Sequence, residues 1–231
     1  QMASDELMLC MTGDPLWAEH CEEVAFNSYP AAVMPDFKGL RYITCPNQTV
    51  SDSKNHHPGI DNRGPFLAMN PFSSRCCQHN HAQGWPYYAE HLILATPDNG
   101  VAAAMYAACK ATVKVGDGNE ISLHEQTNYP FEETIRFTVN TPKAVSFPFY
   151  LRIPSWTEGA TIFVNGKKVA ANPEAGQYAC INREWKDNDQ VEIQLPMQLS
   201  MRTWQVNKNS VSVDYGPLTM SPKIDEDYVK K

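Results

Sequence analysis

The stretches ETIRFTVN (residues 133–140) and VSFPFYLRIP (residues 145–154) decide the fold class of the second half of this chain. Apolar and polar side chains alternate along them, and β-branched and aromatic residues are frequent, as in strands with one buried face. Five further segments have the same character: ATIFVNGKKV, YACINREW, DQVEIQLP, LSMRTWQV and SVSVDYGPLTM. Turn residues such as Asn165-Gly166 separate them. So many short strands at close spacing predict an antiparallel β-sandwich.

The chain before residue 100 carries helix signals instead. Asp14 is the expected N-cap of a helix in TGDPLWAEHCEEVAFNSY, and Pro15 suits its first position. Apolar residues such as Cys21 then recur at helical spacing. Residues 2–12 are expected to form an earlier helix that ends at Gly13. The short link between the two predicts a helical hairpin.

Residues 33–75 form a long connection rich in Pro, Gly, Asn and Asp, with one strand-like piece, LRYITC. Such long connections are often functional. A third helix is expected to start just after Cys76-Cys77 and to run through AQGWPYYAEHLILA (residues 82–95). The next segment, VAAAMYAACKATVKV, stays open. Its alanines favour a helix, whereas KATVKVGDGNEISL is typical of a hairpin with a Gly-Asp-Gly turn.

Composition limits the function classes. The chain has 231 residues, 42% hydrophobic and 19% charged, which is a globular balance. A net charge of −7 and the absence of a Lys/Arg run argue against a nucleic-acid partner and favour a sugar or a small neutral or cationic molecule. The apolar runs are too short to span a bilayer, so no membrane partner is expected. The chain opens at Gln1 without a signal-peptide pattern and reads like a piece that begins inside a helix.

The seven cysteines are odd in number and irregularly spaced, which is a poor fit to a disulfide framework. Four of them are expected to be buried thiols that pack as small hydrophobes: Cys10, Cys21, Cys109 and Cys180. The three tryptophans of the strand region, Trp156, Trp185 and Trp204, are expected in sandwich cores. Near the third helix, Trp85, Tyr87 and Tyr88 form either a sugar-stacking platform or ordinary packing.

The stretch SSRCCQHNH (residues 73–81) carries the chemistry. A thiolate is a strong nucleophile and a soft metal ligand, and both uses require a lowered pKa. A helix start and the neighbouring Arg75 would favour the anionic form. The alternative is a pair of thiols packed at a loop–helix junction. If the pair binds a metal, further ligands could come from Cys45, His56, His57, His79, His81 or Glu90.

The motif CCQHN resembles the CC-x-x-N motif of the β-L-arabinofuranosidase family of glycoside hydrolases. Other segments match that family in the same order. MTGDPLWAEHCEEVAFNS resembles the family helix ahead of the loop. The segments that resemble the β-sandwich half of the family are YPFEETIRFTV, FYLRIPSW, IFVNGK, INREWKDNDQVEIQLPM and VSVDYGPL. The resemblance covers nearly the whole chain.

The resemblance implies an α + β multidomain protein, with partial (α/α)6-barrel helices followed by an antiparallel β-sandwich. Residues 1–100 would be the C-terminal part of the helical catalytic barrel with its active-site loop. Residues 101–225 would form the sandwich, and residues 226–231 a polar tail.

The resemblance also implies a zinc cofactor. Cys76 would be the nucleophile at the anomeric carbon and a zinc ligand, and Cys77 the companion ligand. The family's other two ligands, in a Glu-x-Cys pattern, and its acid Glu would lie before Gln1, in a missing N-terminal portion of the same protein. The stretch CCQHNHAQGW departs from the commoner CC-P-P-N form, which affects the expected substrate more than the chemistry.

Three residues are candidates for sugar contact: Tyr42, His79 and Asn80. The competing interpretations are loop packing for Tyr42, exposure at a helix start for His79, and helix capping for Asn80.

The expected function is part of a retaining glycosidase that releases L-arabinofuranose or a related sugar from plant-derived glycans. Two alternatives stay open. One is a non-catalytic carbohydrate-binding or structural fragment. The other is a self-contained metal site made of Cys76, Cys77, His79 and His81. The location also stays open, because such enzymes are often exported whereas reactive thiols survive best with reductant.

Overall fold

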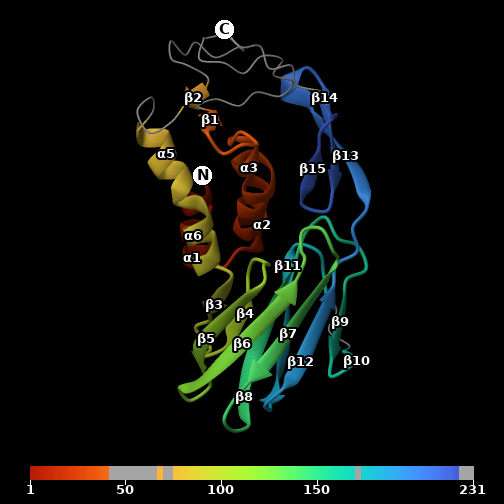
Figure 1. The fold of residues 1–231 in the computed structure, drawn as a ribbon. Helices are drawn as coiled ribbons and strands as arrows, with labels where there is room; N and C mark the ends of the chain where they lie inside the picture. Colours follow the sequence, from red (N-terminus) through yellow and green to blue (C-terminus); the bar gives the residue numbers. More distant parts are fainter. Residues whose placement is uncertain (42–66, 70–74, 170–172, 224–231) are drawn as a thin grey trace.

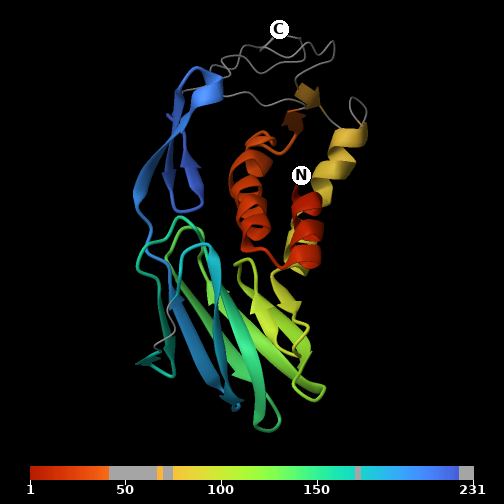
Figure 2. The same cartoon turned by 180° about the vertical axis from the view of Figure 1, so that it is seen from behind.

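A computed structural model describes residues 1–41, 67–69, 75–169 and 173–223. Figures 1 and 2 show a helical layer that stands on one end of a β-sandwich, with a small separate sheet alongside the helices. Tyr42, Cys45, His56, His57 and the predicted tail lie outside the described residues. Among the residues that are described, no helix is long and apolar enough to cross a membrane.

The predicted helical hairpin is confirmed. Helix α1 (Met2–Thr12) ends at Gly13, whose φ of 69° is left-handed. Helix α2 (Pro15–Glu23) begins at Asp14, whose carboxylate accepts a hydrogen bond from the Leu16 amide. The chain continues through a π-helical turn, η1 (Val24–Ser28), and one more helical turn, α3 (Tyr29–Ala31).

The third helix differs from the expectation. It begins at Arg75, so the cysteine pair lies inside its first turn, and it consists of α5 (Arg75–Ala82) and α6 (Gly84–Glu90). The predicted continuation through residues 93–95 is wrong, because Ile93–Ala95 forms strand β3 and pairs with β4 (Val101–Ala103). Sheet pairing here overrides the helix propensity of leucine and alanine.

Two sheets make the sandwich, as predicted. The order of the larger one is β10-β9-β12-β7-β6-β5, and that of the smaller one is β11-β8-β4-β3. The neighbours pair antiparallel, except that β4 and β8 are parallel. The remaining strands are β5 (Cys109–Val115), β6 (Asn119–Thr127), β7 (Thr134–Asn140), β8 (Val145–Ile153), β9 (Thr161–Val164), β10 (Lys167–Lys168), β11 (Gln177–Trp185) and β12 (Asp189–Gln194).

Alternation along the strands builds the core between the two sheets. Phe137 on β7 and Phe149 on β8 are fully buried and meet edge to face, with ring centroids 5.3 Å apart. Trp185 is also fully buried, and its indole N–H donates to the Phe147 carbonyl at 3.0 Å. The prediction that Trp185 packs in the sandwich core is therefore confirmed.

Two turns that the sequence predicts are present. Gly116 and Gly118 both have positive φ and close the β5–β6 hairpin. Asn165 and Gly166 have φ of 51° and 75° and join β9 to β10. Two consecutive positive φ values match the twist of hairpin strands, which explains the Asn-Gly pair.

The last predicted strands form a sheet of their own rather than part of the sandwich. It consists of β13 (Leu199–Trp204), β14 (Ser210–Tyr215) and β15 (Leu218–Met220), with a short 3-10 turn, η2 (Gln205–Asn207), between the first two. The Asn27 side chain fastens this sheet to η1, because its amide donates to the Pro217 carbonyl and its oxygen accepts from the Thr219 amide, both at 2.8 Å. Trp204 is 41% exposed, so its predicted burial in a sandwich core is wrong.

The four cysteines expected to be buried differ in their exposure. Cys21 is fully buried, as predicted, and Cys109 is half-buried. Cys10 and Cys180 are exposed, so the prediction is wrong for them. Cys180 alternates with the buried Ala179 and Ile181 and therefore lies on the outer face of β11.

A short sheet completes the described fold. Strands β1 (Gly39–Arg41) and β2 (Leu67–Met69) pair antiparallel. The strand predicted in LRYITC thus begins at Gly39, and its remainder lies outside the described residues.

Candidate active site

The cysteine pair lies at the end of the helical layer that is farthest from the sandwich (Figure 1). Cys77 is partly buried, while His79 and Asn80 are exposed on α5. Asn80 lies inside α5, and the residue before α6 is Gln83, so the capping interpretation of Asn80 is wrong. The sugar-contact roles of His79 and Asn80 stay predictions, as does that of Tyr42.

Helix α5 is fastened to α3 by one histidine and one tyrosine. The rings of Tyr29 and His81 stack with centroids 4.0 Å apart and planes within 5°. The Tyr29 hydroxyl donates to the His81 carbonyl, and His81 Nε2 lies 3.0 Å from the Tyr29 carbonyl oxygen. A carbonyl only accepts hydrogen bonds, so Nε2 carries the proton and is engaged.

Close packing at the start of α6 completes this attachment. A Cβ atom at Gly84 would overlap the Tyr29 ring, so only glycine allows the ring to lie there. Trp85 meets the same ring edge-on at 5.3 Å and meets Tyr88 at 5.7 Å. Tyr88 is buried, as the packing alternative predicts, whereas Trp85 and Tyr87 remain exposed.

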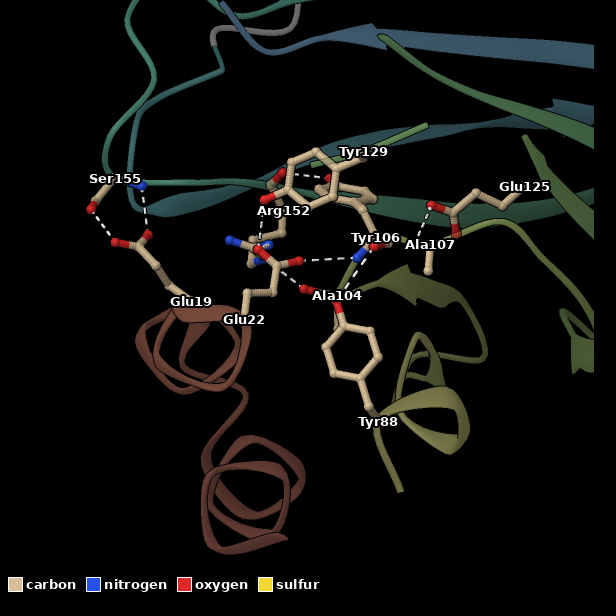
Figure 3. A network of polar contacts seen from close by, with 10 residues as sticks. All are labelled: Glu19, Glu22, Tyr88, Ala104, Tyr106, Ala107, Glu125, Tyr129, Arg152 and Ser155. Atoms are coloured by element: carbon tan, nitrogen blue, oxygen red, sulfur yellow. Dashed lines mark hydrogen bonds and ion pairs between the residues drawn. The ribbon is translucent and has the colours of Figure 1, made fainter. Parts of the chain in front are cut away.

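A buried ion pair joins the helical layer to the sandwich (Figure 3). Glu22 on α2 and Arg152 on β8 are both fully buried, with Oε2 and Nη2 2.5 Å apart. The Tyr129 hydroxyl and the Tyr106 amide also donate to the Glu22 carboxylate, at 2.7 and 3.1 Å. Arg152 Nε donates to the Ala104 carbonyl at 2.5 Å.

Each charge of this pair offsets part of the cost of burying the other. Burial raises the pKa of Glu22, and the adjacent Arg152 guanidinium opposes that rise. Burial alone would lower the pKa of Arg152, but the adjacent Glu22 carboxylate raises it above its usual range. A second link lies nearby, where the Ser155 amide donates to Glu19 Oε2 at 2.7 Å (Figure 3). Helix α2 is thus held on the sandwich by one fully buried ion pair and one exposed hydrogen bond.

Cys109 and Glu125 form a thiol–carboxylate contact separate from this ion pair. Cys109 Sγ donates to Glu125 Oε2 at 3.7 Å, and the Ala107 amide donates to the other oxygen at 3.1 Å. Burial raises the pKa of Glu125 well above its usual value and raises that of Cys109 to about 12. Cys109 is therefore a protonated thiol at neutral pH and is unsuited to act as a nucleophile.

Sequence reasoning missed the buried ion pair, although the pattern held a signal. Glu22 lies on the same helical stripe as Ala18, Cys21 and Ala25, all of which are fully buried. A carboxylate on an apolar stripe requires a partner. The identity of that partner, Arg152, could not be read from spacing, because 130 residues separate the two.

The zinc expectation stays a prediction. Two adjacent thiols at a helix start are the soft donors that zinc accepts. Within the described side chains, no group of three or more His, Cys, Asp or Glu residues could hold a metal ion. The self-contained site includes Cys76, whose side chain lies outside the described side chains, so that site stays a prediction. In the described part of it, His81 Nε2 is hydrogen-bonded to the Tyr29 carbonyl.

Comparisons with known proteins agree with the fold. A family model described as the catalytic domain of GH127 β-L-arabinofuranosidase matches residues 1–90, and one for the GH127 middle domain matches residues 100–197. A search of curated proteins found no match.

Solved structures give the same result. A protein described as a glycoside hydrolase shares 30% identity with a TM-score of 0.76, over 94% of this chain and 36% of that one. A GH127 β-L-arabinofuranosidase from Geobacillus stearothermophilus shares 25% identity with a TM-score of 0.77, over 92% of this chain and 33% of that one. The chain thus spans about a third of the length of these relatives. Because two models of one family match in order and cover both the helices and the sandwich, this chain belongs to the GH127 β-L-arabinofuranosidase family.

Proposed function

We propose that this chain is part of a retaining glycoside hydrolase that releases L-arabinofuranose or a related sugar from plant-derived glycans. The observation that carries the proposal is the match to the GH127 catalytic-domain model over the helices that bear the cysteine pair. The geobacillus relative is itself a GH127 β-L-arabinofuranosidase. The helices of this chain would be the last part of an (α/α)6 barrel.

Cys76 is the proposed nucleophile, and its position in the first turn of α5 supports that role. The first amides of a helix lack intrahelical partners, and the helix dipole favours negative charge there. Both effects lower the pKa of a thiol. By contrast, Cys109 is kept protonated by burial beside Glu125, so the two environments predict opposite reactivity.

Cys76 and Cys77 would hold a zinc ion together with ligands from a preceding segment of the same polypeptide. Such an ion would keep both thiols ionised at neutral pH and fix the nucleophilic sulfur in place. The helix attachment through Tyr29 and His81 would then limit how far the sulfur can move.

The proposed reaction has two displacements at the anomeric carbon. In the first, the Cys76 sulfur forms a bond to this carbon while the bond to the leaving oxygen breaks, and the acid Glu of the preceding segment protonates that oxygen. In the second, water attacks the same carbon and the carbon–sulfur bond breaks. The water proton returns to the same Glu, and two inversions give retention.

The test is a Cys76→Ser variant of the complete polypeptide, assayed on an aryl β-L-arabinofuranoside. We expect kcat to fall by roughly 1,000-fold or more, because a serine hydroxyl is not ionised at neutral pH. Cys180→Ser is the matched control, since Cys180 is exposed on the sandwich, and it should keep full activity. If Cys76→Ser retains activity, Cys76 is not the nucleophile.

The non-catalytic alternative makes a different prediction for the metal content of the protein. Metal analysis separates the two readings. An enzyme would purify with one zinc per chain, and Cys77→Ala would lose it while Cys180→Ser keeps it. A protein without zinc in both variants and in the wild type would favour a structural or carbohydrate-binding role.

A further inference from the structure

A groove lies where the last turn of α1 approaches the outer face of the four-stranded sheet. Its volume is about 550 Å³, and the turn between β3 and β4 forms one wall. Two aromatic side chains from adjacent strands, Tyr150 on β8 and Tyr178 on β11, line it together with the end of α1. The groove is next to the sandwich, whereas the thiols of α5 lie at the opposite end of the helical layer (Figure 1).

Strand alternation directs both tyrosines away from the core. Phe149 and Leu151 are fully buried between the sheets, so Tyr150 between them lies on the outer face. Tyr178 lies on the same face of β11, one diagonal step away in the register. Opposite Tyr150 on β4 stands Ala102, whose small side chain leaves the space beside the ring open.

One carboxylate forms the polar edge of the groove. Asp98 Oδ2 accepts a hydrogen bond from the Tyr150 hydroxyl at 2.6 Å, and Oδ1 accepts one from Thr96 Oγ1 at 2.5 Å. These two hydrogen bonds lower the pKa of Asp98, so it is ionised at neutral pH. Each carboxylate oxygen has a second lone pair, so Asp98 can accept further hydrogen bonds from a ligand.

The lining disfavours anionic ligands and purely apolar ligands. Asp98 is the only charged residue among the described residues that line the groove, and its charge is negative. An anionic ligand would meet repulsion without any compensating cation. A purely apolar ligand would bury the Asp98 carboxylate and lose its hydration. Flat aromatic faces beside a hydrogen-bond acceptor suit a neutral molecule with C–H faces and hydroxyl groups.

We propose that this groove binds a neutral oligosaccharide on the Tyr150 and Tyr178 rings, as a glycan site separate from the cysteine pair. Tyr178 supplies the stacking surface. Asp98 orients the Tyr150 phenol and accepts hydrogen bonds from sugar hydroxyls. The inference does not depend on the thiol chemistry, because none of the described side chains of α5 lines the groove.

The first experiment measures binding of arabinopentaose to the complete polypeptide by titration calorimetry. We expect Tyr178→Ala to weaken binding about tenfold or more, and Tyr178→Phe, which keeps the ring, to bind about as well as the wild type. Hydrolysis of a small aryl glycoside should be unchanged in both variants, which separates this site from the proposed active site. Unaltered affinity in Tyr178→Ala, or no binding to the wild type, overturns the proposal.

A second experiment needs no substitution, so it holds even if Tyr178→Ala does not fold. Cys10 is exposed and lines the groove, so a bound oligosaccharide should shield its sulfur. We expect arabinopentaose to slow alkylation of Cys10 by iodoacetamide, read by peptide mass spectrometry, and an acidic oligogalacturonide to leave it unchanged. Equal shielding by the acidic sugar, or none by the neutral one, contradicts the assignment.

Discussion

Glu125 shows how burial alone sets the behaviour of one residue. Its carboxylate is 1% exposed and accepts hydrogen bonds only from an amide and a thiol among the described residues. Burial raises its pKa well above the usual value, so the folded protein binds this proton more tightly than the unfolded chain does. This group therefore contributes stability at low pH, and the contribution is lost as pH rises from about 4.5 through the folded pKa.

We therefore predict that Glu125→Gln, which imitates the protonated side chain, is more stable than the wild type near pH 8 by at least about 1 kcal/mol. The difference should shrink toward pH 5, and urea unfolding at several pH values measures it. Glu120→Gln on the same strand is the control, because Glu120 is exposed. Parallel profiles for the wild type and Glu125→Gln would show that Glu125 is ionised at no cost.

Helix α5 is an element that depends on contacts far away in sequence. The eight-residue helix is too short to be stable by itself. Its C-terminal end is held by the stacked His81 and Tyr29 rings and by the Tyr29 hydroxyl. The order of α5, and with it the position of the cysteine pair, should follow the integrity of this attachment.

The corresponding prediction concerns Tyr29→Phe, which removes only the hydroxyl. Losing this partly buried hydrogen bond costs about 1 kcal/mol, so the amides of α5 should exchange several times faster with deuterium. Mass spectrometry of the peptide that spans α5 gives the readout. Tyr87→Phe, on the exposed face of α6, should change nothing. Unchanged exchange in Tyr29→Phe would mean that ring stacking alone holds the helix.

In the whole molecule, the Glu22–Arg152 pair couples the helical layer to the sandwich. Both side chains are fully buried, so neither can recover its hydration if the other is lost. Replacement of one partner leaves an unpaired charge inside the protein. Replacement of both partners by apolar residues removes the charge as well as the pair.

We predict that Arg152→Met lowers the free energy of unfolding by about 3–5 kcal/mol. Adding Glu22→Leu should recover part of the loss, because it removes the unpaired charge but leaves the Tyr129 hydroxyl and the Tyr106 amide without their acceptor. Urea unfolding followed by circular dichroism measures both. Arg136→Met is the matched control, since it breaks the exposed Arg136–Glu192 pair on the sandwich and should cost less than about 1 kcal/mol. An equally small loss in Arg152→Met would mean that the pair does not couple the two parts.

Local chemistry made much of the fold predictable from the sequence. The end of α1 at Gly13 and the hairpin at Asn165-Gly166 follow from backbone conformations that few other residues adopt. Period-two alternation likewise predicted the strands of the sandwich. The prediction failed at Ile93–Ala95, where a run of apolar residues suits a helix and a strand equally, and the partner strand β4 decided.

For the candidate site too, some features could be predicted from the sequence and others could not. The sequence by itself determined the cysteine pair, its place near a helix start and its resemblance to a glycosidase family, because motif and spacing are properties of neighbouring residues. Only the tertiary structure decided that His81 holds α5 against Tyr29, that Arg152 neutralises Glu22, and that Tyr150 and Tyr178 share one groove. These contacts join residues that are distant in the chain, and their energy arises only when folding removes water from between them.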